Sequence, residues 1–478
     1  MGRGRARKIG NEKSRFETWA RRVGMSGIRK VAGLAIVAAL CLIQGNGRSA
    51  LARAQAPATG GQEAGQGKQP YTMPEYNAEQ AAAAEKNPAQ QIKLLDDFVS
   101  KYPNSALLIY VYPLYMQAYG QLKDYPKVIT YADKLAGLGD KIDAAARFNA
   151  YYTHAVAYST LLSDPAKGKE AAKDLALAKS AQDAVTAALK TLDEIKKPEG
   201  VTDDAWATQT KQFRMTLNSI GAQAATVQKD YPAAITFYKA YLALNPDEPI
   251  TNYNLGKSYL ALTPPQSMDG FWYVARGAAS KSATQAQAKQ LKEYLRKLIQ
   301  NYQQAACDNL TDAELNELLQ LAAGSVDRPT SYNLPSSADL DAARKDMTIK
   351  SVMEDLKAGG DKSKVTWLAA CGLEFPGVPA KVIENVPGDV PVLKVAFVTS
   401  DAEFDAKTTA DMDVKIVGQP DISRVEKDGA IHFTGTLASY DPDPAFMLHW
   451  EKGKVNEEDI PKEKSAPKKT VRKKPAGR

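Results

Sequence analysis

Apolar residues recur at spacings of three and four along most of residues 75–325. For example, Ile92, Leu95, Phe98 and Val99 fall on one face of a helix. Short breaks at Pro or Gly separate such segments, and strictly alternating runs are absent from this part of the sequence. The pattern predicts helices of roughly 12–20 residues that are joined by short turns and stacked side by side as helix hairpins.

A second pattern, in which apolar and polar residues alternate, begins near residue 390. Turn-forming residues such as Asp428-Gly429 separate the alternating runs. The sequence therefore predicts a small C-terminal β domain over residues 386–455, either a barrel or a sandwich, with strands at 392–398, 412–417, 431–437 and 445–450. Residues 326–385 are expected to connect the two domains and to contain one helix, at about 338–358, before a Gly- and Pro-rich stretch.

The distribution of charge sets the two ends of the chain apart. The 478 residues carry a net charge of +7, but residues 1–56 hold 12 basic and only 2 acidic residues. An apolar run of 13 residues, 31–43, follows these basic residues, and small residues follow it up to Ala54 and Ala56. This order predicts a secretory signal peptide over 1–56, cleaved near Ala54 or Ala56, and a periplasmic or otherwise exported protein. An uncleaved anchor is the alternative, although the run is shorter than the ~20 residues that span a bilayer.

Two further segments read as irregular. Residues 57–74 are rich in Gly, Gln and Pro and predict a flexible linker. Residues 456–478 are basic and poor in apolar residues, which predicts a disordered tail. Such a tail either only keeps the protein soluble or contacts anionic lipid or polysaccharide. The remaining body of the protein is mildly acidic, so nucleic acid is an unlikely partner.

Three cysteines are present, and Cys41 would be removed with the signal peptide. An exported protein can form disulfides, so Cys307 and Cys371 either pair or remain two buried thiols. Neither lies in a C-x-x-C motif or a Cys/His cluster, so no metal site and no cofactor are expected.

One octapeptide pattern occurs twice in the helical part. Residues 123–130 read Lys-Asp-Tyr-Pro-Lys-Val-Ile-Thr, and residues 229–236 read Lys-Asp-Tyr-Pro-Ala-Ala-Ile-Thr. The second copy opens a segment that resembles the 34-residue tetratricopeptide repeat (TPR). The residues that carry the resemblance are Ala222, Ala234, Tyr238 and Pro246 at repeat positions 8, 20, 24 and 32, and Leu255, Gly256 and Tyr259 at positions 7, 8 and 11 of the next repeat.

The resemblance implies a mostly α protein, a right-handed α-solenoid of TPR-like hairpins whose concave groove binds a partner protein or peptide. The groove positions of the family fall on Ser219, Gln223, Ile250, Tyr253, Asn254, Lys257 and Leu260. Asn254 and Lys257 are expected to bind a carboxylate or backbone amides. One departure from the family pattern is Pro113, which predicts a kink or a late start in its helix.

Candidate catalytic residues are scarce. The chain has three histidines, His154, His432 and His449, and no nucleophile-elbow, metalloprotease or phosphate-loop motif. An enzyme is therefore not expected, and a hydrolase is kept only as a minor alternative.

The last strands of the β domain weakly resemble those of OB-like barrels. That resemblance implies the first alternative function, the binding of a glycan or another oligomer, with Tyr440, Phe446 and Trp450 as candidate contact residues. We consider the exported scaffold that binds a partner in the cell envelope the better interpretation.

Overall fold

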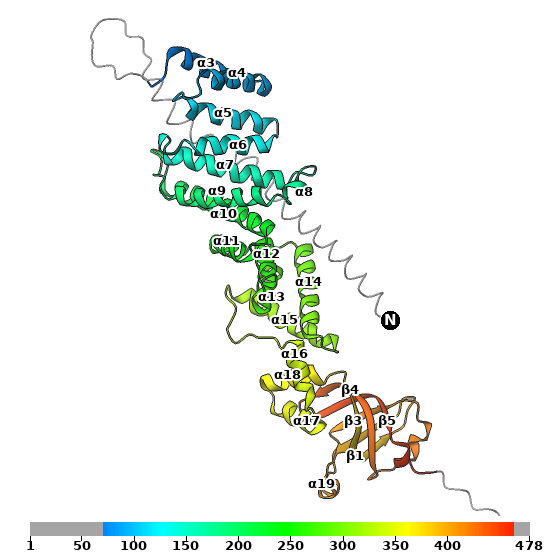
Figure 1. The fold of residues 1–478 in the computed structure, drawn as a ribbon. Coiled ribbons are helices and arrows are strands. Elements are labelled where there is room, and N and C mark those ends of the chain that lie inside the picture. Colours follow the sequence, from blue (N-terminus) through cyan, green and yellow to red (C-terminus); the bar gives the residue numbers. More distant parts are fainter. Residues whose placement is uncertain (1–69, 463–478) are drawn as a thin grey trace, which may run out of the picture. The chain divides into compact units, whose positions relative to one another are not determined.

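The computed structural model describes residues 70–462, and its chain divides into two compact units (Figure 1). The first comprises residues up to 292 together with 319–328, and the second comprises 293–318 and the residues from 329 onward. The expected signal peptide, nearly all of the expected linker and most of the expected basic tail lie outside the described residues, so those interpretations stay predictions. Within 70–462, no helix has the length and apolar character needed to cross a membrane.

The first unit is helical, as the periodicity predicts. Consecutive helices pack on one another in chain order, with α7 packing on α9 past the short α8. The helices are α3 (Met73–Ala84), α4 (Pro88–Lys101), α5 (Leu108–Gln121), α6 (Tyr125–Ala136), α7 (Ala144–Leu162), α8 (Gly168–Ala171), α9 (Leu175–Leu192), α10 (Asp203–Gln228), α11 (Tyr231–Leu244), α12 (Pro249–Leu260) and α13 (Ser267–Ala279), with a 3₁₀ turn at Gly139–Lys141. Two further helices follow, α14 (Gln285–Gln303) and α15 (Asp308–Gly324), and each is divided between the two units.

Side chains at the helix starts explain several of these boundaries. Asn87 accepts hydrogen bonds from the N–H groups of Ala89 and Gln90 at 3.0 and 3.1 Å, and Pro88 occupies the first turn of α4. Thr72 caps α3. The helical part therefore begins at residue 73, inside the segment that was expected to be linker, because an N-cap hydroxyl and a first-turn Pro favour a helix start there.

Pro113 does not delay its helix. α5 begins five residues earlier, at Leu108, and continues through Pro113 to Gln121. The Pro113 side chain is buried. Packing of this apolar segment outweighs the loss of one backbone hydrogen bond, so the expectation of a late start is wrong.

Close backbone packing holds α12 against α13. A Cβ atom on Gly256 would lie 2.6 Å from the Gly270 carbonyl oxygen and 2.8 Å from Val274 Cγ2, and one on Gly277 would lie 2.7 Å from the Pro249 carbonyl oxygen. The two helices can approach this closely only because these positions lack side chains.

The second unit contains three short helices where one was expected. They are α16 (Ser337–Lys345), α17 (Ile349–Ala358) and α18 (Gly360–Ala370). Thr348 accepts a hydrogen bond from the Ser351 N–H at 3.1 Å and so starts a new helix inside the predicted one. Gly359, with a φ of 71°, ends α17. Local capping thus divides the segment that the periodicity suggested was continuous.

The β domain is a closed barrel rather than a sandwich, with strand order β1-β2-β3-β5-β4 (Figure 1). β3 pairs with β5 in parallel and every other pair is antiparallel. Val395, Val414, Phe433 and Trp450 are completely buried in its core. The strands are β1 (Glu374–Val386), β2 (Val392–Phe397), β3 (Met412–Ile416), β4 (Ala430–Asp441) and β5 (Met447–Val455), and α19 (Asp401–Ala406) and two 3₁₀ turns, η2 (Pro420–Arg424) and η3 (Glu457–Asp459), complete the domain.

The first strand begins at Glu374, well before the predicted boundary at 386. Pro376 and Gly377 obscured it in the sequence, because Pro in a run argues against a strand. The register of β1 on β4 shifts between Phe375 and Val378, so Pro376 and Gly377 lie where the ladder is irregular.

The end of the described chain also differs from expectation. Asp459, in the η3 turn, accepts a hydrogen bond from the His432 N–H at 2.7 Å. Asn456 also donates its N–H to the His432 carbonyl oxygen at 2.8 Å, and Ile460 packs against the core of the barrel. The expectation of a disordered tail is therefore wrong for residues 456–460.

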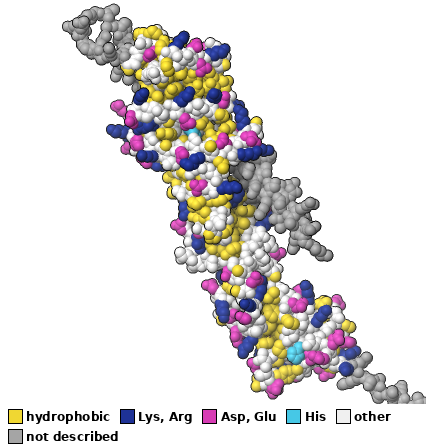
Figure 2. Space-filling view, in the orientation of Figure 1, with side chains coloured by type: hydrophobic (Ala, Val, Ile, Leu, Met, Phe, Trp, Pro, Cys, Tyr) yellow, Lys and Arg dark blue, Asp and Glu magenta, His cyan; other side chains and the backbone are white. Residues whose placement is uncertain are grey.

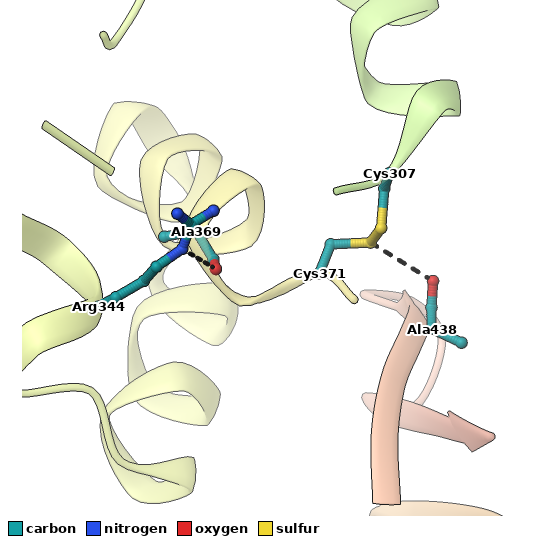
Figure 3. The surroundings of a disulfide bond; sticks show 5 residues. All are labelled: Cys307, Arg344, Ala369, Cys371 and Ala438. Atoms are coloured by element: carbon teal, nitrogen blue, oxygen red, sulfur yellow. Dashed lines mark hydrogen bonds between the residues drawn. A yellow bond between two sulfur atoms is a disulfide. The ribbon is translucent and has the colours of Figure 1, made fainter. Parts of the chain in front are cut away.

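A disulfide joins Cys307, at the start of α15, to Cys371, at the end of α18, with their Cα atoms 6.0 Å apart (Figure 3). Cys371 Sγ lies 3.7 Å from the Ala438 carbonyl oxygen on β4, and Arg344 Nε donates to the Ala369 carbonyl oxygen at 3.0 Å (Figure 3). Of the two pairing alternatives, the structure contains the disulfide.

Candidate functional site

The expected groove residues lie on α10 and α12, but they do not form one open surface. Tyr253 is 1% exposed and Ile250 is 9% exposed, so neither is available to a partner. The family pattern placed both on a groove, whereas here they belong to the core of the first unit. These two assignments are therefore wrong.

Two more of the expected groove residues are used inside the fold. Gln223 Oε1 accepts a hydrogen bond from Ser159 Oγ at 3.3 Å, which connects α10 to α7. Leu260 packs closely over Gly270, where a Cβ atom would lie 2.5 Å from Leu260 Cγ. Ser219, Asn254 and Lys257 are partly exposed, and the Lys257 ammonium lies 5.4 Å from the centre of the Tyr253 ring. These three remain candidates for contact with a partner.

A set of stacked tyrosines forms a more distinctive surface, and it was not predicted. The rings of Tyr115 and Tyr131 lie 3.9 Å apart at an interplanar angle of 10°. Tyr119 stacks on Tyr131 at 5.6 Å, and the Tyr112 ring lies 6.1 Å from it. Tyr115 is buried, whereas Tyr112, Tyr119 and Tyr131 are partly exposed. We call these four residues of α5 and α6 the tyrosine stack.

Charged groups flank the tyrosine stack. The Tyr115 hydroxyl donates to Asp96 Oδ1 on α4 at 2.6 Å, and the Lys134 ammonium lies 4.6 Å from the centre of the Tyr131 ring. Burial, and then the neighbouring Asp96 carboxylate, raise the pKa of the Tyr119 phenol, and burial likewise raises that of Tyr131. The stack therefore presents neutral phenol rings, which bind apolar or cationic groups through their faces and polar groups through their hydroxyls.

Part of the tyrosine stack could have been predicted from the sequence. Tyr112, Tyr115 and Tyr119 follow at spacings of three and four, which places them on one side of a helix. Hydrophobic side chains, a class that includes Tyr, are exposed over α4 and α5 (Figure 2). The contribution of Tyr131 from α6 was not visible in the sequence, because it depends on how two helices pack.

His154 lies in a polar row across three helices. Its Nδ1 is 2.7 Å from Asp133 Oδ1 on α6, and its Nε2 is 3.5 Å from Ser180 Oγ on α9. The order of groups is that of a Ser-His-Asp relay. Ser180, however, lies within α9, where the surrounding N–H groups bond inside the helix and cannot bind an oxyanion. We interpret the row as a polar link between α6, α7 and α9.

His432 and His449 bind separate carboxylates rather than sharing a site. His432 Nδ1 lies 3.2 Å from Asp459 Oδ2. His449 lies between two carboxylates, with Nδ1 2.8 Å from Asp413 Oδ2 on β3 and Nε2 2.9 Å from Asp441 Oδ2 on β4. In residues 70–462 there is no group of three or more His, Cys, Asp or Glu side chains suited to holding a metal ion.

The aromatic residues expected to contact a ligand on the barrel are mostly packed. Trp450 is fully buried, so its assignment as a contact residue is wrong. Tyr440 packs edge-on against Trp367 of α18 at 4.9 Å, and the Lys357 ammonium of α17 lies 4.7 Å from the centre of the Phe446 ring. Tyr440 and Phe446 thus face the helices of their own unit.

Two lysines that point outward from the barrel strands pair with carboxylates on neighbouring strands. Lys394 Nζ lies 2.7 Å from Glu384 Oε2, and Lys415 Nζ lies 3.3 Å from Glu451 Oε1. These lysines are neutralised by neighbouring carboxylates, which disfavours phosphate binding on this face.

An open recess of about 510 Å³ lies at one end of the barrel. The loop between β1 and β2 and the segment after β3 form its walls, and Val390 and Val417 line it with side chains that are 53% and 49% exposed. Large apolar side chains this exposed are expected at contact surfaces.

The chain was compared with known proteins. It matches no protein-family model, and no curated protein sequence is significantly similar to it. The functional argument therefore depends on the geometry of these sites.

Proposed function

We propose that this is an exported scaffold protein, whose helical unit is a right-handed solenoid of TPR-like hairpins that binds a partner protein or peptide in the cell envelope. The sequence pattern of residues 1–56 supports export. The repeated local geometry of the hairpins supports the repeat assignment, and the tyrosine stack supports partner binding.

The repeat assignment is supported by two turns that have the same structure. Asp124 and Asp230 each accept a hydrogen bond from the N–H three residues later, at 3.3 and 3.1 Å. Thr130 and Thr236 each donate to the carbonyl oxygen of the first-turn Pro, at 2.9 and 3.1 Å. The recurrence of the octapeptide is thus accompanied by a recurrence of backbone geometry, as expected of structural repeats.

The register of the best-matching repeat extends into the next helix. Gly256, at the small-residue position 8, packs closely on α13, since a Cβ atom there would lie 2.6 Å from the Gly270 carbonyl oxygen. In the same register Trp272 falls at the aromatic position 24 and Ala275 at position 27, and both are completely buried.

The tyrosine stack is the observation that carries the binding proposal. Three partly exposed phenol rings from two adjacent helices offer a rigid aromatic surface, and they lose little conformational entropy when they bind. Aromatic side chains are enriched at protein interfaces for this reason.

The test is site-specific photocrosslinking in intact cells. A photoreactive phenylalanine analogue placed at Tyr112 or at Tyr119 is expected to capture one recurring partner. The same analogue at Lys179, an exposed position on α9, is the matched control. Equal capture from all three positions, or none from the tyrosine positions, would contradict the proposal.

A glycan- or oligomer-binding barrel is the second candidate. It is favoured by the closed five-stranded barrel, in which only β3 and β5 are parallel, and by the open recess at its end. Thermal unfolding of the full chain with and without soluble cell-wall glycan fragments tests this candidate. An unchanged barrel transition at all fragment concentrations argues against it.

A further inference from the structure

The recess at the end of the barrel continues into a second recess of about 430 Å³, and the two share Asn385, Pro387 and Ser423. Asn385 Nδ2 donates to the carbonyl oxygens of Ile422 and Val425 at 2.9 and 3.0 Å. The walls are therefore fixed by hydrogen bonds, and the combined recess is a preformed feature of the barrel.

The rim of the recess is mainly acidic. Asp389 lines the first part, and Glu426 and Lys427 line the second. Glu384 also lines the second part but is already paired with Lys394. The whole of residues 374–462 is also acidic, with 17 Asp and Glu against 9 Lys and Arg, a net charge of −8. An occupant of matching chemistry would combine an apolar side chain with several basic residues.

The segment that follows the described structure has this composition. Residues 463–478 contain 7 Lys and Arg and 1 Glu, a net charge of +6. Val471 is its only large apolar residue, and it lies within the sequence Lys468-Lys-Thr-Val-Arg-Lys-Lys474. The aliphatic parts of the flanking Lys and Arg side chains can cover apolar surface while their charges reach the rim carboxylates.

The C-terminal segment leaves the barrel at a place from which it can reach the recess. Gln419 lines the recess, and its side chain forms two hydrogen bonds of 2.7 Å with the backbone of Val455, the last residue of β5. From residue 462 to Val471 the extended chain spans up to about 30 Å.

We propose that residues 463–478 bind back onto the barrel of the same chain, with Val471 between Val390 and Val417 and the flanking basic residues against the rim carboxylates. Bound in this way, the segment fills the recess. Its basic side chains are then paired with rim carboxylates, so the segment offers less positive charge to anionic surfaces. This inference concerns the barrel alone and does not depend on the proposed function of the helical unit.

Limited trypsin digestion of the full chain tests the proposal. Cleavage after Lys468, Lys469 and Arg472 is measured by mass spectrometry, with a synthetic peptide of residues 463–478 as the unbound reference. A segment that is bound nine-tenths of the time is cut about tenfold more slowly than the free peptide, because cleavage follows the unbound population. About 0.5 M NaCl should remove most of this protection by screening the charges.

Variants of the recess leave the cleaved sequence unchanged. Val417→Asn and Val390→Asn, at half-exposed positions, remove the apolar contact without adding charge and are expected to raise the cleavage rate toward that of the peptide. Val326→Asn, at a valine of the first unit that is 55% exposed, is the matched control and should keep the protection. Thermal unfolding of each variant checks that the barrel is intact.

Three outcomes would overturn the proposal. The first is a wild-type segment that is cut as fast as the free peptide. The second is protection that rises with protein concentration, which indicates binding to a second copy. The third is protection that appears only when phosphatidylglycerol vesicles are added, which indicates a membrane surface as the occupant.

Discussion

Lys123 and Lys229 adopt the same left-handed backbone conformation, with φ values of 57° and 60°. Each lies one residue before the Asp that caps the next helix. In both turns the N–H of that Asp donates to a carbonyl oxygen near the end of the preceding helix, that of Tyr119 or Ala225, at 2.9 Å. Two segments far apart in the sequence thus form the same turn.

Because the two turns have the same structure, we predict that removing the N-cap carboxylate of either turn destabilises the protein by the same amount. Asp124→Ala and Asp230→Ala should each lower the free energy of unfolding by about 1 kcal/mol, the usual contribution of an N-cap carboxylate. Asp97→Ala, at an exposed position within α4, is the control and should change little. Urea unfolding monitored by circular dichroism measures all three. A large difference between the two cap variants would show that the turns are not equivalent.

The glycine contact between α12 and α13 gives a second prediction. Gly256→Ala should destabilise the protein by about 1–3 kcal/mol, because its Cβ atom would press on the Gly270 carbonyl and on Val274. Gly120→Ala adds the same methyl group within α5, where no atom lies within 4 Å of it, and should stabilise by up to about 1 kcal/mol. Opposite shifts in thermal unfolding are expected, and a stabilising Gly256→Ala would contradict the close packing.

The disulfide gives a third prediction. Replacing Cys307 and Cys371 together by Ala should lower the stability of the second unit by about 2–4 kcal/mol, since the bond closes a long loop in the unfolded chain. Thermal unfolding with and without dithiothreitol measures the effect. Reduced wild type should resemble the double variant, and the variant itself should not respond to the reductant. If dithiothreitol leaves the wild type unchanged, the bond contributes little.

His449 predicts a dependence of barrel stability on pH. Burial lowers the pKa of His449, but its hydrogen bonds to Asp441 and Asp413 outweigh burial and raise the pKa above the ordinary value of 6.5. A raised folded-state pKa means that the stabilisation is complete below pH 6.5 and is lost as the pH rises through the folded value. Only the imidazolium can donate to both carboxylates.

The measurement is thermal unfolding of wild type and His449→Gln across the neutral range. The difference in melting temperature should be largest at the acidic end and should shrink as the pH rises. His432→Gln, whose imidazole contacts the single carboxylate of Asp459, is the matched control. A difference that is constant with pH would contradict the role assigned to the charged imidazole.

Sequence patterns predicted the secondary structure well where the cause is local. The helical part, the later strands and the twin turns at Asp124 and Asp230 all depend on residues within one turn or on a simple periodicity. Capping is also local, yet Thr348 and Gly359 divided a segment that periodicity alone indicated was a single helix. Strand β1 was not recognised, because Pro376 argues against a strand and lies where the ladder is irregular.

Functional sites were predicted less well, because they depend on burial. Tyr253 and Trp450 have the residue types of contact positions, but the folded chain buries them at 1% and 0% exposure. The tyrosine stack was missed for the converse reason, since Tyr131 joins Tyr115 only when α6 packs on α5.

The sequence by itself determined which segments form helices and strands and where several of them begin, because backbone preference, capping and apolar periodicity act between residues that are near one another in the chain. Tertiary structure alone decided which of the aromatic residues remain exposed, that Cys307 reaches Cys371, and that the recess opens beside the residue where β5 ends. Each of these depends on distances between residues that are far apart in the chain, and those distances are set by the packing of whole elements.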